Sequence, residues 1–332
     1  MAHGAVLELW SIHDQDYQEF LDSFEVFSRD SLNFYQNATD DFMQVRRYYK
    51  VLNRLCTLGN VEKMYFPPII DANVGVFENQ ILFEAGFADE LNLAPGKHAL
   101  EIGCGRGRIT HHVASHTGAK CTGMNIDPFQ IKVANQYANE TGMASQLRFL
   151  EGNMNDAFPF EDGTFDAFYQ VQAMTYAQNL TKVFSEVYRV LKPGAKASVL
   201  DGVILGGFNE SNPYHRQLLR KTREVTGWGA FVPPSEFESA AESAGFRILS
   251  SKDPSLSPDR EGSQAMLIMK EARYFGVVAA IVKAAAWMGI IPAHIDTLVE
   301  RLNRHGESYI EMDRKNMLTT SWHILLQKPA LA

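Results

Sequence analysis

The stretch HALEIGCGRGRITHHV, residues 98–113, decides the fold. A short apolar run leads into three closely spaced glycines, Gly103, Gly105 and Gly107, and these lead directly into an amphipathic segment. Glycine permits the tight turn that joins a strand to a helix, and it lets a ligand approach the backbone closely. The stretch therefore predicts a strand, a ligand-binding glycine loop and a helix.

Four further apolar runs follow the first one and alternate with amphipathic segments. This alternation is typical of a parallel sheet with helical crossovers. The predicted helix before the fifth strand ends at Pro193-Gly194, because proline cannot continue a helix and glycine commonly ends one. We predict strands at residues 98–103, 121–125, 147–152, 165–171 and 196–202, and helices at 109–118, 128–142 and 180–194.

The rest of the chain is predicted to add helices and to complete the sheet. The polar segment at 208–234 is too long for an ordinary loop and is expected to form a cap. A helix at 235–246 leads into a strand at 246–253, which pairs with a final strand at 321–329. The predicted domains are a helical N-terminal extension (1–90), a Rossmann-like core (91–207), the cap (208–234) and a C-terminal part (235–332) with a helical insertion (254–320).

Composition favours a globular protein of the cytoplasm. The chain has 332 residues, 45% of them hydrophobic, which is ample for a core. We exclude nucleic acid as a partner, because the net charge is -8 and basic residues cluster only locally. Cys56, Cys104 and Cys121 form no C-x-x-C pair, so neither a disulfide framework nor a zinc site is expected. The N-terminus has no pattern typical of a signal peptide.

The residues around the glycines distinguish two kinds of cofactor. Dinucleotide-binding loops usually have the spacing G-x-G-x-x-G after an apolar residue. Here the spacing is E-x-G-x-G-x-G, which places Glu101 at the end of the strand. A carboxylate there attracts the ammonium group of a methionine moiety and repels a pyrophosphate. The loop therefore favours S-adenosyl-L-methionine.

With this motif the chain resembles the class I S-adenosylmethionine-dependent methyltransferases. The resemblance implies a Rossmann-like, seven-stranded α/β sheet with S-adenosyl-L-methionine bound at its edge. It also implies that Asn125 binds the ribose, that Asn153 and Met154 hold the adenine, and that Gln170 faces the methionine part. The implied cofactor-binding residues are Glu101, Gly103, Cys104, Gly105, Gly107, Asn125, Ile126, Gln130, Asn153, Met154, Asn155 and Gln170.

Within that class the chain is similar to the sterol C-methyltransferases. The shared stretches are GAKCTGMNIDPFQIKVAN at 118–135, FPFEDGTFDAFYQVQAMTYAQNL at 158–180 and NPYHR at 212–216. This likeness implies C-methylation of a sterol or a related lipid, with an apolar small molecule as acceptor. Gln172 and Tyr176 stand where side-chain methylating members carry an acid and a histidine, so a ring carbon beside a ketone is a candidate target.

Tyr176 and Asp201 are the candidate catalytic residues, and two other functions stay open. One is N- or O-methylation of a small metabolite, and the other is a non-catalytic module that binds S-adenosylmethionine. Further polar groups expected near the acceptor are Asp71, Asn73 and Glu78.

Two further features of the sequence bear on ligands and partners. His111, His112 and His116 share one predicted helix, but they have no third ligand and no accompanying glutamate, so no metal is expected. The apolar segment 275–292 is expected to be a buried or groove-lining helix, with contact to a membrane surface as the alternative. A peripheral location at an internal membrane and a homo-oligomer therefore both stay open.

Overall fold

The computed structural model describes residues 14–27, 43–51, 62–255, 276–277 and 279–330. The chain divides into two compact units, each assembled from separate stretches of sequence. Unit 1 comprises Met1–Met64, Leu205–Phe231 and Pro258–Leu318, and unit 2 comprises Tyr65–Ile204, Val232–Ser257 and Thr319–Ala332.

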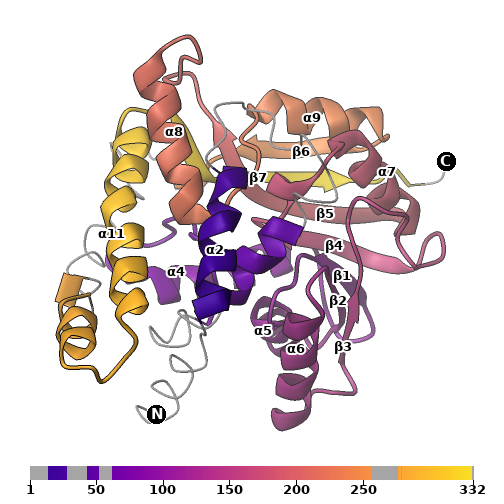
Figure 1. Ribbon diagram of the computed structural model, residues 1–332. Helices are drawn as coiled ribbons and strands as arrows, with labels where there is room; N and C mark the ends of the chain where they lie inside the picture. The colour runs from indigo at the N-terminus through magenta and orange to yellow at the C-terminus, as the bar shows by residue number, and fades with distance from the viewer. Residues whose placement is uncertain (1–13, 28–42, 52–61, 256–275, 278, 331–332) are drawn as a thin grey trace. The chain divides into compact units, whose positions relative to one another are not determined.

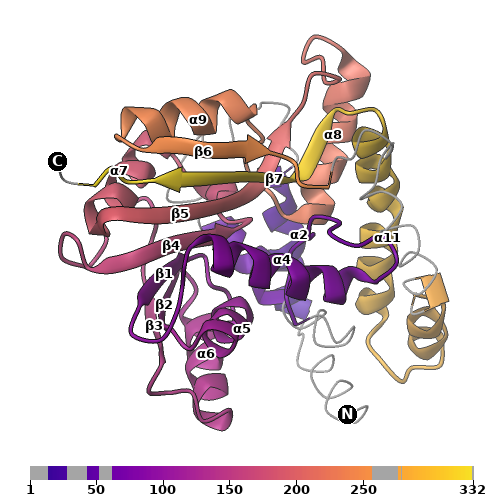
Figure 2. The same ribbon diagram turned by 180° about the vertical axis from the view of Figure 1, so that it is seen from behind.

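Unit 2 is built on a seven-stranded sheet in the order β3-β2-β1-β4-β5-β7-β6 (Figures 1 and 2). The pairs β1–β2, β2–β3, β1–β4 and β4–β5 are parallel, and β6 and β7 are antiparallel. The strands are β1 (His98–Ile102), β2 (Lys120–Asn125), β3 (Leu147–Glu151), β4 (Phe165–Val171), β5 (Leu191–Ile204), β6 (Arg247–Lys252) and β7 (Leu318–Gln327). This confirms the predicted α/β fold. Because chain order reverses between β1 and β4, the carboxyl ends of these two strands are where such a sheet binds its ligand.

Helices cover both faces of this sheet (Figure 2). One face carries α4 (Val76–Glu90), α5 (Arg108–Thr117) and α6 (Pro128–Glu140), whose apolar residues share one core with the strands. On the other face α7 (Leu180–Val190) packs against α9 (Pro234–Ser243). Local signals start and stop these helices: Asp127 caps α6 through the Phe129 N–H, and Gly118 ends α5 at φ 71°.

The junction between α7 and β5 differs from the prediction. The helix was expected to reach residue 194, but it ends at Val190, and Leu191 already pairs with Phe165 of β4. The reason is steric, because the proline ring at 193 disfavours helical geometry in the residue before it. The last four residues of the predicted helix are therefore strand.

The described part of unit 1 is mainly helical. It contains α2 (Asp14–Phe27), α8 (Pro213–Thr226) and α11 (Ala293–Arg314), and α8 packs against both of the others. Tyr48 is fully buried and lies 5.2 Å from the ring of Phe20 and 4.8 Å from that of Phe27. The predicted extension, cap and insertion all contribute to this unit. Within the described ranges, no helix is long and apolar enough to cross a membrane.

Candidate functional site

The three glycines after β1 have different physical roles, although all three adopt left-handed backbone geometry. A Cβ on Gly103 would lie 2.3 Å from the Cβ of Ala173, and one on Gly107 would lie 2.6 Å from the Phe149 ring. These two positions need glycine because neighbouring elements pack against them. A Cβ on Gly105 would meet only Oε1 of Gln130, at 3.6 Å. Gly105 therefore leaves an open space beside the loop, and we call this space the hollow.

The glycine loop is hydrogen-bonded to β2 and leads directly into α5. The N–H groups of Gly103 and Cys104 both donate to the carbonyl of Met124, at 2.8 and 3.3 Å. Helix α5 then begins at Arg108, and its N-cap residue Gly107 provides no side-chain cap. An uncapped helix start presents N–H groups and partial positive charge, which suit the carboxylate of an amino acid.

Glu101 supplies the negative charge of the site. Its side chain is buried at the end of β1 and accepts a 2.5 Å hydrogen bond from the hydroxyl of Thr110. Burial first, and then the charge of Glu101, raise the pKa of the Cys104 thiol and of the Tyr169 hydroxyl well above their usual values. A buried negative charge that perturbs its neighbours in this way favours a cationic ligand over an anionic one.

A pair of amides lies beside the loop, at the end of β2. Asn125 donates through Nδ2 to Oε1 of Gln130, at 2.7 Å, and Gln130 is buried at the start of α6. This bond orients Asn125, whose Oδ1 is suited to accept a hydroxyl hydrogen from a ribose. Ile126, which is partly buried, follows directly and adds apolar surface.

The three cofactor-binding residues predicted after β3 differ in exposure. Asn153 and Met154 are partly exposed, whereas Asn155 is buried. The amide of Asn155 donates to the carbonyl of Tyr176 at 3.1 Å and accepts from the N–H of Gln178 at 2.6 Å. Asn155 therefore joins the loop after β3 to the segment after β4, and Asn153 and Met154 are the more accessible pair.

Gln170 and Asp201 form a buried polar pair at the ends of β4 and β5. Gln170 donates to the Leu200 carbonyl at 3.0 Å and to Asp201 at 3.3 Å, and accepts from the Ala173 N–H at 2.8 Å. Asp201 also accepts from the N–H groups of Met174 and Gly202, both at 2.8 Å. Both side chains therefore shape the turn after β4. Burial raises the pKa of Asp201 to about 7, although these hydrogen bonds lower it.

That turn carries Gln172 and the short helix η1 (Met174–Tyr176). Gln172 has a φ of 53°, a left-handed geometry that is uncommon for residues other than glycine and asparagine. Its amide accepts from the Phe66 N–H at 3.0 Å and donates to the carbonyls of Phe66 and Thr320 at 2.7 and 2.8 Å. Tyr176 is partly exposed at the end of η1.

A second network, which the sequence did not reveal, links α4 and α5 near the glycine loop. The carboxylate of Glu84 is fully buried and accepts from the Tyr65 hydroxyl at 2.8 Å, and its other oxygen lies 2.6 Å from Nδ1 of His112. His116 lies 3.1 Å from Asp89 in the same way. These two histidines thus pair with carboxylates. In the part of the chain that the structure describes, no cluster of three or more potential ligands could hold a metal ion.

Three of the groups expected near the acceptor, Asp71, Asn73 and Glu78, lie just before α4 or in its first turn. Asp71 accepts from the N–H and the side chain of Asn73, at 2.8 and 2.9 Å, and Glu78 is exposed in the first turn of α4. In unit 1, His215 accepts at Nδ1 from the N–H of Asn209, at 3.0 Å. His215 therefore helps to shape the start of α8.

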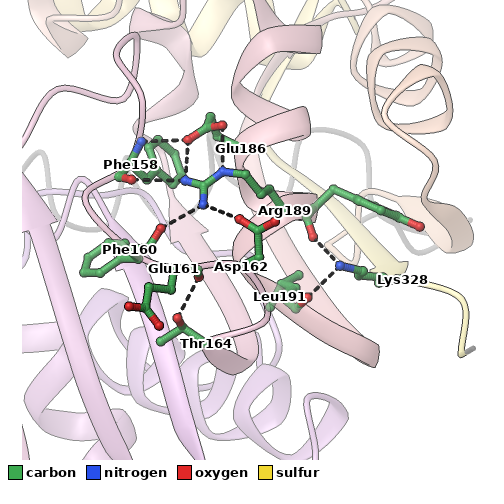
Figure 3. Close-up of polar contacts among 10 residues, drawn as sticks. Phe158, Phe160, Glu161, Asp162, Thr164, Glu186, Arg189, Leu191 and Lys328 are labelled. Atoms are coloured by element: carbon green, nitrogen blue, oxygen red, sulfur yellow. Dashed lines mark hydrogen bonds and ion pairs between the residues drawn. The ribbon is translucent and has the colours of Figure 1, made fainter.

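At the other end of β4, one arginine organises the loop that leads into the strand (Figure 3). Arg189, in the last turn of α7, donates to the carbonyls of Phe158 and Phe160 and pairs with Asp162 and Glu186, at 2.8–3.0 Å. Such a fork of bonds suits the planar guanidinium group. This network fixes where β4 begins, and it lies away from the carboxyl ends that form the site.

The donor set as a whole fits S-adenosylmethionine. An open glycine hollow, a helix start, a buried carboxylate and an oriented amide pair meet at the carboxyl ends of β1 and β2. The helix start matches the carboxylate of the methionine, Glu101 matches its ammonium group and the amide pair matches the ribose, while the glycine hollow leaves space for the molecule.

Comparisons with known proteins agree with this assignment. Residues 100–199 match the family model described as a methyltransferase domain. The chain is 28% identical to methyltransferase phqN of Penicillium fellutanum, over 71% of this chain and 73% of that protein. It is 33% identical to the sterol 24-C-methyltransferase ERG6A of Gibberella zeae, over 64% of this chain but only 56% of that protein.

The fold also matches a solved structure over most of its length. A putative sarcosine dimethylglycine methyltransferase from Galdieria sulphuraria superposes with a TM-score of 0.64 at 19% identity, covering 86% of this chain and 98% of that one. At this identity the match speaks for the fold alone. Together with the motif, the site and the family model, it leads to one conclusion: the chain contains a class I S-adenosylmethionine-dependent methyltransferase domain.

Proposed function

We propose that the protein methylates a carbon atom of a sterol or a related lipid, at a ring position beside a ketone. The observation that carries this proposal is the state of Gln172, whose amide is bonded at both ends to main-chain groups. An acid at this position would serve to take a proton from a carbocation, and Gln172 cannot do so. The likeness to a sterol C-methyltransferase supports the acceptor class.

A carbon beside a ketone needs no carbocation chemistry. Its enol form is a nucleophile, and after attack the enol O–H passes its proton through the hydroxyl of Tyr176 to solvent while the ketone re-forms. Bound S-adenosylmethionine supplies an electrophilic methyl group, and the electron pair of the broken carbon–sulfur bond stays on sulfur. The protein must then align the two carbon atoms and exclude water, effects that contribute up to roughly 7–11 kcal/mol in favourable cases.

Particular residues of the chain carry these tasks in the proposal. Asn125 and Gln130 hold the ribose, Glu101 attracts the ammonium group, and Asn153 with Met154 contacts the adenine. Tyr176 faces the acceptor and hydrogen-bonds the enol oxygen, and Asp201 acts through the turn that positions Tyr176. Two observations support the last two roles: Tyr176 is partly exposed, and Asp201 accepts hydrogen bonds from the Met174 N–H and from the Gln170 amide.

The decisive experiment supplies the purified protein with methyl-labelled S-adenosylmethionine and a lipid extract. We expect label in a lipid product whose methyl group mass spectrometry assigns to a ring carbon. Reducing the ketones of the extract with borohydride is the control, and it should abolish labelling because an alcohol cannot form an enol. Label found only in polar metabolites would instead indicate an N- or O-methyltransferase. Binding of S-adenosylmethionine in calorimetry without label in any product would indicate the non-catalytic binding module.

A further inference from the structure

The segment before α11 exposes large apolar side chains to solvent. Residues 276–277 and 279–287 are helical, and a turn joins them to α11 (orange in Figure 1). Trp287 alone is 87% exposed. We call the following set the apolar patch: Val277, Ile281, Trp287, Met288 and Ile290, each between 49% and 87% exposed. These exposures contradict a buried helix for the outer side of this segment, but not the groove-lining or membrane-surface alternatives.

The inner side of the same segment is apolar as well. Val282 and Ile291 are 8% and 5% exposed, so the buried side chains of the segment are apolar too. A surface helix of a soluble protein normally places polar residues on its outer side. A helix that is apolar all round, with its outer side unburied, indicates that this side meets a second apolar phase.

The charges of the segment select a lipid surface as that phase. Residues 276–292 contain one charged side chain, the exposed Lys283, and no aspartate or glutamate, although the whole chain has a net charge of -8. Tryptophan and lysine together are typical of the boundary between lipid head groups and hydrocarbon, where the indole ring is amphipathic and the ammonium group reaches phosphates.

A second copy of the chain fits this surface less well. In a two-fold dimer the same patch meets itself, which would bring two Lys283 side chains together within an apolar contact. The segment provides no carboxylate to neutralise them. Lysine is also depleted in the centres of protein interfaces.

We propose that the apolar patch inserts into the head-group region of an anionic lipid bilayer, with Lys283 on the lipid phosphates. The helical stretch is much shorter than the roughly 20 residues that span a bilayer, so the contact is superficial. The purpose of this contact rests on the proposed function, because an apolar acceptor is dissolved in the bilayer and the enzyme must collect it there.

Co-sedimentation with vesicles tests the proposal directly. The full-length protein should sediment with vesicles of phosphatidylcholine and phosphatidylserine, and less with phosphatidylcholine alone. The double variant Ile281→Ser/Trp287→Ser should lower the partition coefficient by about a hundredfold, at about tenfold for each apolar side chain. Lys283→Ala should remove about a fivefold preference for the anionic vesicles. Leu249→Ser, at a 38% exposed position on β6, is the matched control and should change nothing.

Two results would overturn the proposal. One is equal sedimentation of the wild type and the double variant. The other is a dimer in light scattering that the double variant splits, since the patch would then be a subunit interface. Methyl transfer to detergent-dispersed lipid is measured in parallel. If transfer to lipid persists without vesicle binding, only the membrane contact is wrong; if vesicles bind but only polar metabolites are labelled, only the proposed acceptor is wrong.

Discussion

The side chain of Gln172 bonds both polar main-chain groups of Phe66, accepting from its N–H at 3.0 Å and donating to its carbonyl at 2.7 Å. The side-chain amide of Gln172 thereby satisfies both main-chain groups of Phe66 as a neighbouring strand would, although the two residues are 106 positions apart. A third bond, to the Thr320 carbonyl at 2.8 Å, joins β7 to the same point. The left-handed φ of 53° at this residue costs about 1–3 kcal/mol, which these three bonds offset.

The substitution Gln172→Glu should therefore damage the protein instead of restoring a catalytic base. A carboxylate has no hydrogen to donate and would face the carbonyls of Phe66 and Thr320 in a buried position. We expect a loss of about 2–4 kcal/mol in the free energy of unfolding, because buried acceptors lose their donor and a charge is desolvated. Urea unfolding measures it.

Gln172→Met serves as the control for this prediction. It keeps the volume of the side chain and removes the bonds without adding a charge. It should cost less stability than Gln172→Glu at neutral pH. A glutamate variant as stable as the wild type, with faster methyl transfer, would show that position 172 is an acid site and would contradict the proposed role.

The sheet and the cofactor loop could be predicted from sequence because their signals are local. The spacing of Glu101 and the glycines lies within seven residues, and apolar runs alternate with amphipathic ones over the whole core. The error at the start of β5 also has a local cause. Pro193 disfavours helical geometry in the residue before it, so α7 ends at Val190, about one turn before the predicted end at residue 194.

The remaining features depend on contacts between residues far apart in the chain. The sequence shows that position 172 carries a glutamine in place of an acid. It does not show that Phe66 is the hydrogen-bonding partner of Gln172, because nothing in either segment specifies the other. Glu84 could have been suspected as a charged residue among Phe83, Phe87 and Ala88 on the apolar side of α4. Its bonds to Tyr65 and His112 become visible only when α4 and α5 pack together.

Glu101→Gln should weaken the binding of S-adenosylmethionine by about tenfold or more, because a charged hydrogen bond contributes about 1.5–3 kcal/mol. The amide keeps the size of the side chain and can still accept from the hydroxyl of Thr110. Calorimetry with the cofactor gives the dissociation constant. Methylthioadenosine is the internal control, since it lacks the ammonium group and should bind wild type and variant alike. An equal loss for both ligands would place Glu101 in a structural role.

Alanine at Gly105 and at Gly103 should have different effects. At Gly105 the added methyl group enters the open hollow, so the fold survives with a cost of about 1–2 kcal/mol for left-handed geometry, and cofactor binding is lost. At Gly103 it collides with the Cβ of Ala173, so the fold itself is destabilised. Thermal unfolding and calorimetry separate the two effects.

Gly163→Ala is the matched control for that pair. Gly163 has a φ of 62°, and an added Cβ would have no neighbour within 4 Å, in the loop before β4. It should lose about as much stability as Gly105→Ala and bind the cofactor normally. If Gly105→Ala also binds normally, the hollow at Gly105 is not the cofactor site.

Two buried groups should give opposite pH dependences of stability. Burial raises the pKa of Asp201 to about 7, so its contribution to stability is complete below about pH 4 and is lost as the pH rises towards 7. Burial lowers the pKa of His323 to about 4, so its contribution is complete above about pH 6.5 and is lost as the pH falls towards 4. Each pKa shift corresponds to about 3–4 kcal/mol in the free energy of unfolding. Between about pH 4 and 6.5 the two contributions change in opposite directions, so their changes nearly cancel.

Replacing either group should make the pH dependence that the other contributes measurable. In Asp201→Asn, where only the His323 contribution remains, the free energy of unfolding should rise by about 3 kcal/mol between about pH 4 and 6.5. In His323→Gln, which keeps a hydrogen-bonding group for Ser198, it should fall by a similar amount over the same range. Urea unfolding at a series of pH values measures both slopes against the wild type. Parallel profiles for all three proteins would mean that neither group titrates differently in the folded and unfolded states. Asp201 would then be ionised at neutral pH and would hold the turn before Tyr176 as a carboxylate.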